Sequence, residues 1–270
     1  MYCRDDQHRR EDRFVIDKHA LIDPSARIAE NVHIGPWTLI GANVEIDEGT
    51  WIGPHAVIQG PTRIGKDNKI YQFASIGEAP QDKRYKDEPT RLEIGDRNIF
   101  RECCTIHRGT VLGREVTKIG NDNLFMAYTH VAHDCIVGNQ TIFANNASIA
   151  GHVSVGDYAH LGGMVGVHQF CSIGAHSFAA GGAIIFKDVP PFVTVSGYPA
   201  EAHGLNTVGL ERRGYSAEAI LALKRAYKVI FRQSLTIQEA ISELNSMIQE
   251  IPEVKLFTDF LSKSERGIVR

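Results

Sequence analysis

The sequence predicts a mainly β protein, in which a parallel β-helix of hexapeptide repeats precedes a C-terminal α-helical region. Three observations predict this fold class. An apolar residue recurs at every sixth position, a small or β-branched residue follows it four positions later, and glycine often comes directly after it. A 3.6-residue period would rotate such positions around a helix. Short strands, each followed by a tight turn, keep them in line, and three such units close one triangular coil.

The six-residue register runs through most of the chain. Its first ten members are Ile22, Ile28, Ile34, Ile40, Ile46, Ile52, Ile58, Ile64, Ile70 and Ile76. It resumes at residues 94–106 and, after a shift of one residue, continues through residues 119–185. We expect these side chains to fill a narrow prism. The repeat resembles that of the hexapeptide-repeat acyltransferase superfamily, and this resemblance implies a left-handed β-helix and assembly as trimers.

The composition excludes several classes of protein. The chain has 270 residues, of which 43% are hydrophobic and 23% charged, and a net charge of -3. A protein that binds nucleic acid through bulk charge would be basic. No apolar run approaches the roughly 20 residues of a membrane span. Neither a disulfide framework nor structural zinc is expected, and a reducing cytoplasm fits best, because the five cysteines form no CxxC motif.

The repeat pattern divides the chain into three regions. Residues 1–13 are charged and lack the apolar core of a secretory signal, so we expect a disordered extension there. Residues 14–195 carry the β-helix, which polar insertions at residues 78–93 and 109–117 interrupt. Residues 196–270 are expected to be helical, because helix-capping residues precede apolar residues at helical spacing.

Histidines gather in the second half of the repeat region, at positions that do not point inward. His133 and His152 lie about one coil apart, so both are expected to face outward, where they could be solvated, line a groove between subunits or bind a metal ion. A neutral imidazole can take a proton from a hydroxyl, and Asp134 could orient the His133 ring. Cys135 occupies an inward position, and no other nucleophile stands out. This favours direct acyl transfer over a covalent acyl-enzyme.

Several longer motifs make the resemblance more specific. They include Ile70-Tyr-Gln-Phe-Ala-Ser-Ile-Gly-Glu78, Thr105-Ile-His-Arg-Gly-Thr110, His130-Val-Ala-His-Asp-Cys135, Gly151-His-Val-Ser154, Val167-His-Gln-Phe-Cys171 and Gly209-Leu-Glu-Arg-Arg-Gly214. Together they resemble the UDP-N-acetylglucosamine O-acyltransferase family, which opens lipid A synthesis, over essentially residues 14–270. The resemblance implies a cytoplasmic homotrimer that needs no metal or other cofactor. It would move a 3-hydroxyacyl chain from acyl carrier protein to the glucosamine 3-hydroxyl of UDP-N-acetylglucosamine.

The resemblance also implies roles for individual residues. His133 would be the general base, Asp134 its dyad partner, and the Gly151 backbone N–H an oxyanion donor. The residues implied to bind substrate are Asp82, Arg84, His130, His152, His168, Gln169, Asn206 and Arg212. Gly181 falls at the chain-length ruler of the family. Because glycine cannot block the groove, we expect a chain of about fourteen carbons by analogy.

Two positions depart from the family pattern. Arg84 stands where the family often has lysine, which keeps a positive charge but changes its geometry. Val208 stands where relatives can carry an acidic residue that contacts ribose, so this contact is expected to be missing.

Three other interpretations remain open from the sequence. One is a later N-acyltransferase of the same pathway, but the chain before Ile22 leaves no room for the extra domain that this enzyme typically carries. The second is a γ-class-like metal-dependent carbonic anhydrase, which would need three converging histidines. The third is a β-solenoid binding module without enzymatic activity, which would leave the outward histidines and the two loops without a role.

Overall fold

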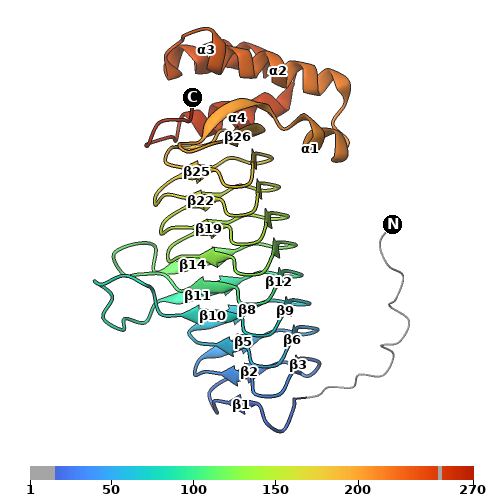
Figure 1. Cartoon of the computed structure of the whole chain (residues 1–270), viewed down its shortest axis with the longest axis vertical. Helices are drawn as coiled ribbons and strands as arrows, with labels where there is room; N and C mark the ends of the chain where they lie inside the picture. The colour runs from blue at the N-terminus through green and yellow to red at the C-terminus, as the bar shows by residue number, and fades with distance from the viewer. Residues whose placement is uncertain (1–15, 249–250) are drawn as a thin grey trace.

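The structure is a tall stack of triangular coils with a helical layer at one end (Figure 1). This computed structural model describes residues 16–248 and 251–270. The extension expected at residues 1–13 lies outside the described residues. The coils place their short strands in three sheets, which confirms the predicted left-handed parallel β-helix with C-terminal helices. None of the helices in the described residues is long and apolar enough to cross a membrane.

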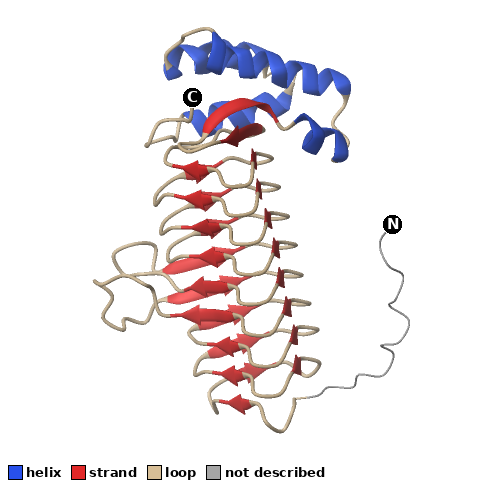
Figure 2. Ribbon diagram, viewed as in Figure 1, coloured by secondary structure: helices blue, strands red, loops and turns tan. Residues whose placement is uncertain are grey.

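Each sheet forms one long face of the prism, and successive strands of the chain fall in different sheets (Figure 2). Sheet 1 comprises β1 (Leu21–Ile22), β4 (Leu39–Ile40), β7 (Val57–Ile58), β10 (Ser75–Glu78), β13 (Thr105–His107), β16 (His130–Val131), β19 (Ser148–Ile149), β22 (Gly166–Val167) and β25 (Ile184–Ile185). Sheet 2 comprises β2 (Arg27–Ile28), β5 (Val44–Ile46), β8 (Thr62–Ile64), β11 (Arg91–Ile94), β14 (Val116–Ile119), β17 (Ile136–Val137), β20 (Ser154–Val155) and β23 (Ser172–Ile173). Sheet 3 comprises β3 (His33–Ile34), β6 (Trp51–Ile52), β9 (Lys69–Ile70), β12 (Ile99–Phe100), β15 (Leu124–Phe125), β18 (Ile142–Phe143), β21 (His160–Leu161), β24 (Phe178–Ala179), β26 (Val193–Ser196) and β27 (Glu201–Leu205).

The six-residue repeat determines the pairing of the strands. Equivalent inward residues pair one coil apart, as Ile22 pairs with Ile40 in sheet 1. Inward residues such as Ile52, Phe100 and Val131 are fully buried. Since burying one such side chain contributes roughly 1.5–3 kcal/mol, this column of apolar residues is the main source of stability for the prism.

Glycine in the repeat allows neighbouring coils to lie close together. The third residue after the inward one often has a positive φ, but it is rarely glycine, as Asn43 and His55 illustrate. The glycine directly after the inward residue faces the next coil instead. A Cβ on Gly35 would lie 2.7 Å from the backbone nitrogen of Pro54. The fixed phase of glycine therefore reflects close contact between neighbouring coils.

A buried ladder of asparagine side chains, Asn68, Asn98 and Asn123, follows the corner between sheets 2 and 3. The Asn98 Nδ2 donates to Asn68 Oδ1 (3.0 Å) and to the Gly120 carbonyl oxygen (2.9 Å). Its Oδ1 accepts from the backbone nitrogen (3.0 Å) and Nδ2 (2.9 Å) of Asn123. Because the side-chain amide of each asparagine hydrogen-bonds to the amide of the next, these polar groups have partners inside the prism.

The C-terminal helices cover the last coils (Figure 1). They are α1 (Thr207–Arg212), α2 (Ala217–Arg232), α3 (Ile237–Met247), the 3-10 turn η1 (Pro252–Val254) and α4 (Lys255–Leu261). Ser216 caps α2, and Thr236 with Glu239 forms the capping box of α3. The buried Asp188 carboxylate accepts a hydrogen bond from Ser264 Oγ (2.7 Å) and so ties the end of the chain to the last coil.

Two loops leave the corner between sheets 1 and 2 at mid-height (Figure 1). The first joins β10 to β11 and comprises residues 79–90, and the second joins β13 to β14 and comprises residues 108–115. The sequence pattern assigned 78–93 and 109–117 to these loops. The difference arises because β10, β11 and β14 lengthen to four residues and pair with their neighbours at the base of the loops.

Candidate active site

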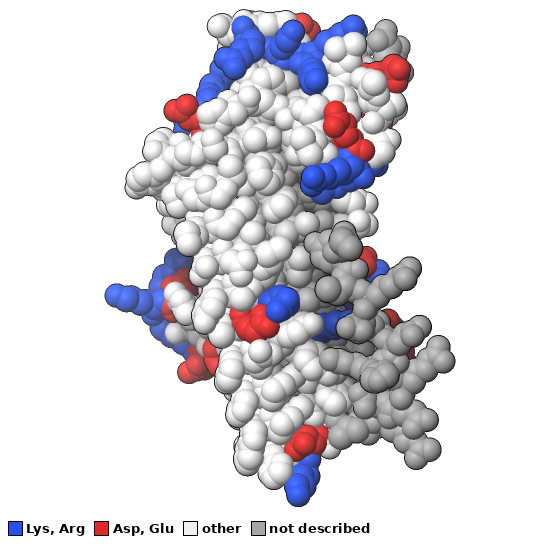
Figure 3. Space-filling view, turned by 45° about the vertical axis from the view of Figure 1, so that its right-hand side comes forward, with Lys and Arg blue, Asp and Glu red and all other residues white. Residues whose placement is uncertain are grey.

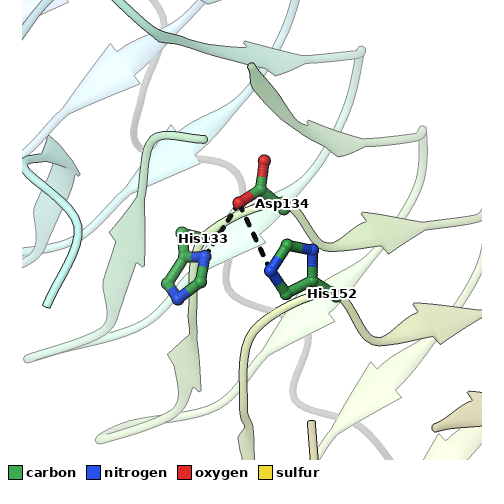
Figure 4. A group of neighbouring side chains, drawn as sticks. All are labelled: His133, Asp134 and His152. Carbon is green, nitrogen blue, oxygen red and sulfur yellow. Dashed lines mark hydrogen bonds and ion pairs between the residues drawn. The ribbon is translucent and has the colours of Figure 1, made fainter. Parts of the chain in front are cut away.

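The two residues of the predicted dyad are in contact at the corner between sheets 1 and 2 (Figure 4). His133 Nδ1 lies 2.8 Å from Asp134 Oδ2. Successive residues of a strand would point to opposite faces. Here both residues lie in the turn after β16, and the positive φ of Asp134 (60°) makes the contact possible. Aspartate tolerates this left-handed conformation better than most residues.

Asp134 is ionised although its side chain is fully buried. Burial alone would raise the pKa of the carboxyl, but hydrogen bonds from His133, Thr110 and the backbone N–H of Arg114 outweigh it and lower the pKa to about 2. An ionised carboxylate can only accept hydrogen bonds. The His133 Nδ1 therefore carries the proton of the shared bond, and its Nε2 is left free to accept one.

The free nitrogen of His133 faces Gly151 of the next coil. A Cβ at position 151 would lie 2.7 Å from His133 Nε2 and 2.6 Å from His133 Cε1. Glycine is thus required at this position to leave room for the imidazole ring. Gly151 therefore packs directly against the nitrogen that can act as a base.

A groove of about 460 Å³ runs along sheet 1 beside this pair. Four of the predicted site residues line it, namely His130, His133, Gly151 and His168. Its floor consists of small residues, and its upper end is apolar, with Ile184 and Phe186. A groove with polar groups at one end and an apolar wall at the other suits a ligand that has a polar head and an alkyl chain.

Two further histidines stand at the polar end of the groove. His130 Nδ1 lies 2.7 Å from Thr105 Oγ1, and burial lowers the pKa of His130. His107 packs edge-on against His130, with ring centroids 5.0 Å apart. Histidines outside the prism core were expected to face outward. His107 is nevertheless only 3% exposed, and burial lowers its pKa to about 4.

The third side chain of Figure 4, His152, raises the question of a metal site. His133, Asp134 and His152 offer ligand atoms within 4.8 Å of one another. The oxygens of Asp134, however, already accept hydrogen bonds from the Thr110 N–H and hydroxyl, the Arg114 N–H and His133. A metal ion would have to displace these donors. The donor set therefore fits a hydrogen-bonded dyad better than a metal centre.

The first loop brings Asp82 and Arg84 towards the groove. Arg84 pairs with Asp82 through its Nη2 (2.8 Å) and Nε (3.2 Å). Hydrogen bonds from Arg84 lower the Asp82 pKa to about 2. Arg84, which stands where the family often has lysine, therefore fixes the Asp82 carboxylate within the first loop. Gln81 of the same loop lines the groove. In the sequence, only its position next to Asp82 could have indicated that it belongs to the site.

Asn206 and Arg212 lie elsewhere, in a second pocket of about 580 Å³ against sheet 3. Asn206 Oδ1 accepts from the Gly209 N–H (3.1 Å) and caps α1, while its Nδ2 donates to the His176 carbonyl oxygen (3.0 Å). Val208, at the position that departs from the family pattern, lines the same pocket. One copy of the chain does not unite these residues with His133.

Two more of the predicted residues, like Asp82, Arg84, Asp134 and His152, line neither pocket. Gln169 is exposed at the corner between sheets 1 and 2, one coil beyond Gly151. Gly181 is exposed at the opposite edge of sheet 1, in the turn between β24 and β25. It therefore lies near the apolar end of the groove, close in the chain to Ile184.

Comparisons with known proteins extend over nearly the whole chain. The family model described as Udp N-acetylglucosamine O-acyltransferase, Domain 2, matches residues 188–269, and the bacterial transferase hexapeptide model (six repeats) matches residues 116–151. The chain is 57% identical over 256 residues to the acyl-[acyl-carrier-protein]–UDP-N-acetylglucosamine O-acyltransferase of Stutzerimonas stutzeri, which covers 95% of this chain and 99% of that protein. The protein of the same name from Thiobacillus denitrificans is 59% identical over 93% of this chain and 97% of its own length. The solved structure of LpxA from Acinetobacter baumannii matches with a TM-score of 0.93 and 51% identity, over 94% of this chain and 99% of that chain.

Proposed function

Because this chain belongs to the family of acyl-[acyl-carrier-protein]–UDP-N-acetylglucosamine O-acyltransferases, we propose that His133 is the general base of its reaction. The enzyme transfers an acyl chain from acyl carrier protein to UDP-N-acetylglucosamine, the first step of lipid A synthesis. One observation carries the assignment of the base. The Asp134 carboxylate holds the Nδ1 proton of His133 and leaves Nε2 open beside Gly151.

The proposed step is a direct displacement. His133 Nε2 takes the proton of the glucosamine 3-hydroxyl while that oxygen attacks the thioester carbon. The Gly151 N–H donates to the oxyanion that forms. The tetrahedral intermediate then expels the carrier thiolate, which receives the proton from the imidazolium. Asp134 stabilises the positive charge of His133 in the meantime.

The surface supports a homotrimer. Outward residues of sheet 2 form ion pairs, such as Arg27–Glu45 and Lys118–Glu93. Outward residues of sheet 3 are mainly apolar or aromatic, and Figure 3 shows a broad uncharged stretch along the β-helix. The corner between sheets 3 and 1 carries large exposed side chains: Trp37, Phe73, Tyr128 and Met164. An apolar ridge beside the weakly charged face of sheet 3 suits a packing of three prisms around that corner.

Such a packing would set sheet 1 of one subunit against sheet 3 of the next. The groove of His133 and the pocket of Arg212 are lined by strands at similar heights in the stack. The two sets of residues would then meet across a subunit boundary. A guanidinium in the second pocket suits the diphosphate of the nucleotide. We therefore propose that each active site is shared by two subunits.

This arrangement predicts that two inactive variants restore activity when they are mixed. His133→Ala and Arg212→Ala damage opposite sides of the shared site. Refolded or co-expressed together at equal amounts, they should recover about a quarter of the wild-type rate, since three quarters of random trimers are mixed and each mixed trimer has one intact site of three. The measurement is acyl transfer from 3-hydroxyacyl carrier protein to UDP-N-acetylglucosamine.

The matched control mixes His133→Ala with Asp134→Ala, which damage the same side and should not complement each other. Recovery in that mixture, or no recovery in the first one despite mixed trimers, would refute the shared site.

The open corner at Gly181 predicts the length of the acyl chain. The corner carries no side chain, and a Cβ there would meet only the Gly163 backbone, at 3.3 Å from its oxygen. We expect Gly181→Met to lower kcat/KM for a fourteen-carbon 3-hydroxyacyl donor by about a hundredfold relative to a ten-carbon one, since each buried CH₂ is worth about 0.8 kcal/mol. Competition between the two donors in one reaction measures this ratio directly, and an unchanged ratio would exclude Gly181 as the ruler.

We also propose how the acyl carrier protein docks and where the reaction takes place. Lys224, Lys228 and Arg232 are exposed on one side of α2, and Figure 3 shows basic side chains gathered at this end of the molecule. A basic helix face complements an acidic carrier protein. Buried free thiols at Cys104 and Cys135 fit the reducing conditions of the cytoplasm.

A further inference from the structure

The second loop lies against the carboxylate of the dyad. A fully buried carboxylate in apolar surroundings would be protonated at neutral pH. Asp134 is ionised because hydrogen-bond donors surround it, and most of these donors come from residues 110–117, one coil earlier in the chain. The sequence pattern treated this segment only as an interruption of the repeat.

The donors leave little freedom for the carboxylate. The Thr110 hydroxyl donates to Asp134 Oδ2 at 2.7 Å, and the Arg114 N–H donates to Oδ1 at 2.7 Å. The backbone N–H of Asp134 itself donates to Thr117 Oγ1 at 2.8 Å. Gly113 passes so close that a Cβ there would lie 2.5 Å from Asp134 Oδ1.

The carboxylate has two possible imidazole partners. His133 Nδ1 lies 2.8 Å from Oδ2, while His152 Nε2 lies 3.8 Å from the same oxygen. Because both imidazoles approach Oδ2, the two rings compete for the same oxygen. Since the Thr110 hydroxyl binds the contested oxygen, it fixes the rotation at which His133 is the partner.

The side chain of Arg114 adds a second constraint. Its Nη1 donates to the carbonyl oxygens of Asp134 and, at 3.4 Å, of His152. It thus ties the corner that carries the dyad to the corner of the next coil, where Gly151 precedes His152. This connection adds to the hydrogen bond from the His152 N–H to the His133 carbonyl oxygen (3.0 Å), which joins the two coils directly.

We propose that the second loop is an orienting device for the dyad, with Thr110 as a positioning residue that commits Asp134 to His133 rather than to His152. This inference rests on the proposed role of His133. It goes beyond that role, because it assigns the choice of partner to a buried residue that lines neither pocket.

The experiment compares Thr110→Val, which keeps the shape and loses the hydroxyl, with Thr110→Ser, which keeps the hydroxyl. Thr110→Val should lower kcat about tenfold and leave KM for UDP-N-acetylglucosamine within about twofold, since only the transition state requires the oriented base. Thr110→Ser should retain most of kcat. Thr141→Val is the control, because it removes another buried hydroxyl, which donates to Asn123 Oδ1 at 2.7 Å on a different corner. It should lower Tm and spare kcat.

A second measurement does not depend on turnover. In protein with isotope-labelled histidine, the hydrogen-bonded Nδ1 proton of His133 should give a downfield NMR signal that His133→Ala removes. Thr110→Val should broaden or shift that signal, and Thr110→Ser should preserve it. Equal kcat in Thr110→Val and wild type, equal loss in both Thr110 variants, or an unchanged proton signal would overturn the proposal. If His133→Ala keeps full activity while the signal behaves as expected, the proposed base fails and the orienting role stands.

Discussion

His133→Ala is expected to lose acyl transfer by about 10²- to 10⁴-fold in kcat, the usual contribution of a positioned general base. Among the described residues that line the groove, only His133 has a side-chain nitrogen in hydrogen-bond contact with an ionised carboxylate. The variant removes this nitrogen. The substrate hydroxyl would then have to give its proton to water. Binding of the nucleotide should change little, because its expected pocket lies against another sheet.

The measurement is a transfer assay from 3-hydroxyacyl carrier protein, with circular dichroism and sedimentation to verify fold and assembly. His203→Ala is the matched control, since His203 is exposed in β27 and lines neither pocket. Transfer by the control at the wild-type rate is expected. A His133→Ala enzyme as fast as wild type would show that another group takes the proton.

Asn98→Ala is expected to lower the free energy of unfolding by about 3 kcal/mol or more, because a buried donor or acceptor that loses its partner costs about 1–3 kcal/mol. The change removes the central rung of the asparagine ladder. Asn123 loses the acceptor of two of its nitrogens, and the Gly120 carbonyl loses a donor. A cavity inside the prism adds to the cost.

Urea denaturation followed by far-UV circular dichroism measures this effect. Asn31→Ala serves as the comparison, because Asn31 is exposed and its Oδ1 accepts one hydrogen bond, from the Gly49 N–H at 2.9 Å. That variant should change stability by only about 0.5 kcal/mol, as surface substitutions usually do. Similar losses in the two variants would mean that the ladder contributes nothing beyond a single exposed hydrogen bond.

The β-helix could be predicted from the sequence because one local rule governs every coil. Ile22 pairs with Ile40 and Ile28 with Ile46 for the same reason, a period of six in a three-sided coil. The ladder was missed because asparagine at an inward position contradicts that rule in isolation. Asn98 becomes favourable only when Asn68 and Asn123 lie directly below and above it.

The candidate site likewise contains residues that the sequence predicted and contacts that it could not predict. His133, Asp134 and Gly151 came from motifs, and the structure brings them together at one corner. The support of Asp134 by Thr110 could not be read from the sequence, since it depends on a loop folding back over the next coil. The burial of His107 beneath its neighbours likewise depends on side chains distant in the chain.

The helical layer over the last coil has a consequence for polymer growth. A parallel β-helix has no natural end, because each coil offers its neighbour a row of open N–H and C=O groups, and such edges recruit strands from other molecules. Here β27 turns back to pair antiparallel with β26, and the helices follow directly. The hydrogen bonding that stacks coils within one molecule is thereby stopped at this end. A chain shortened before β27 would carry an unfinished edge and would be prone to form fibres.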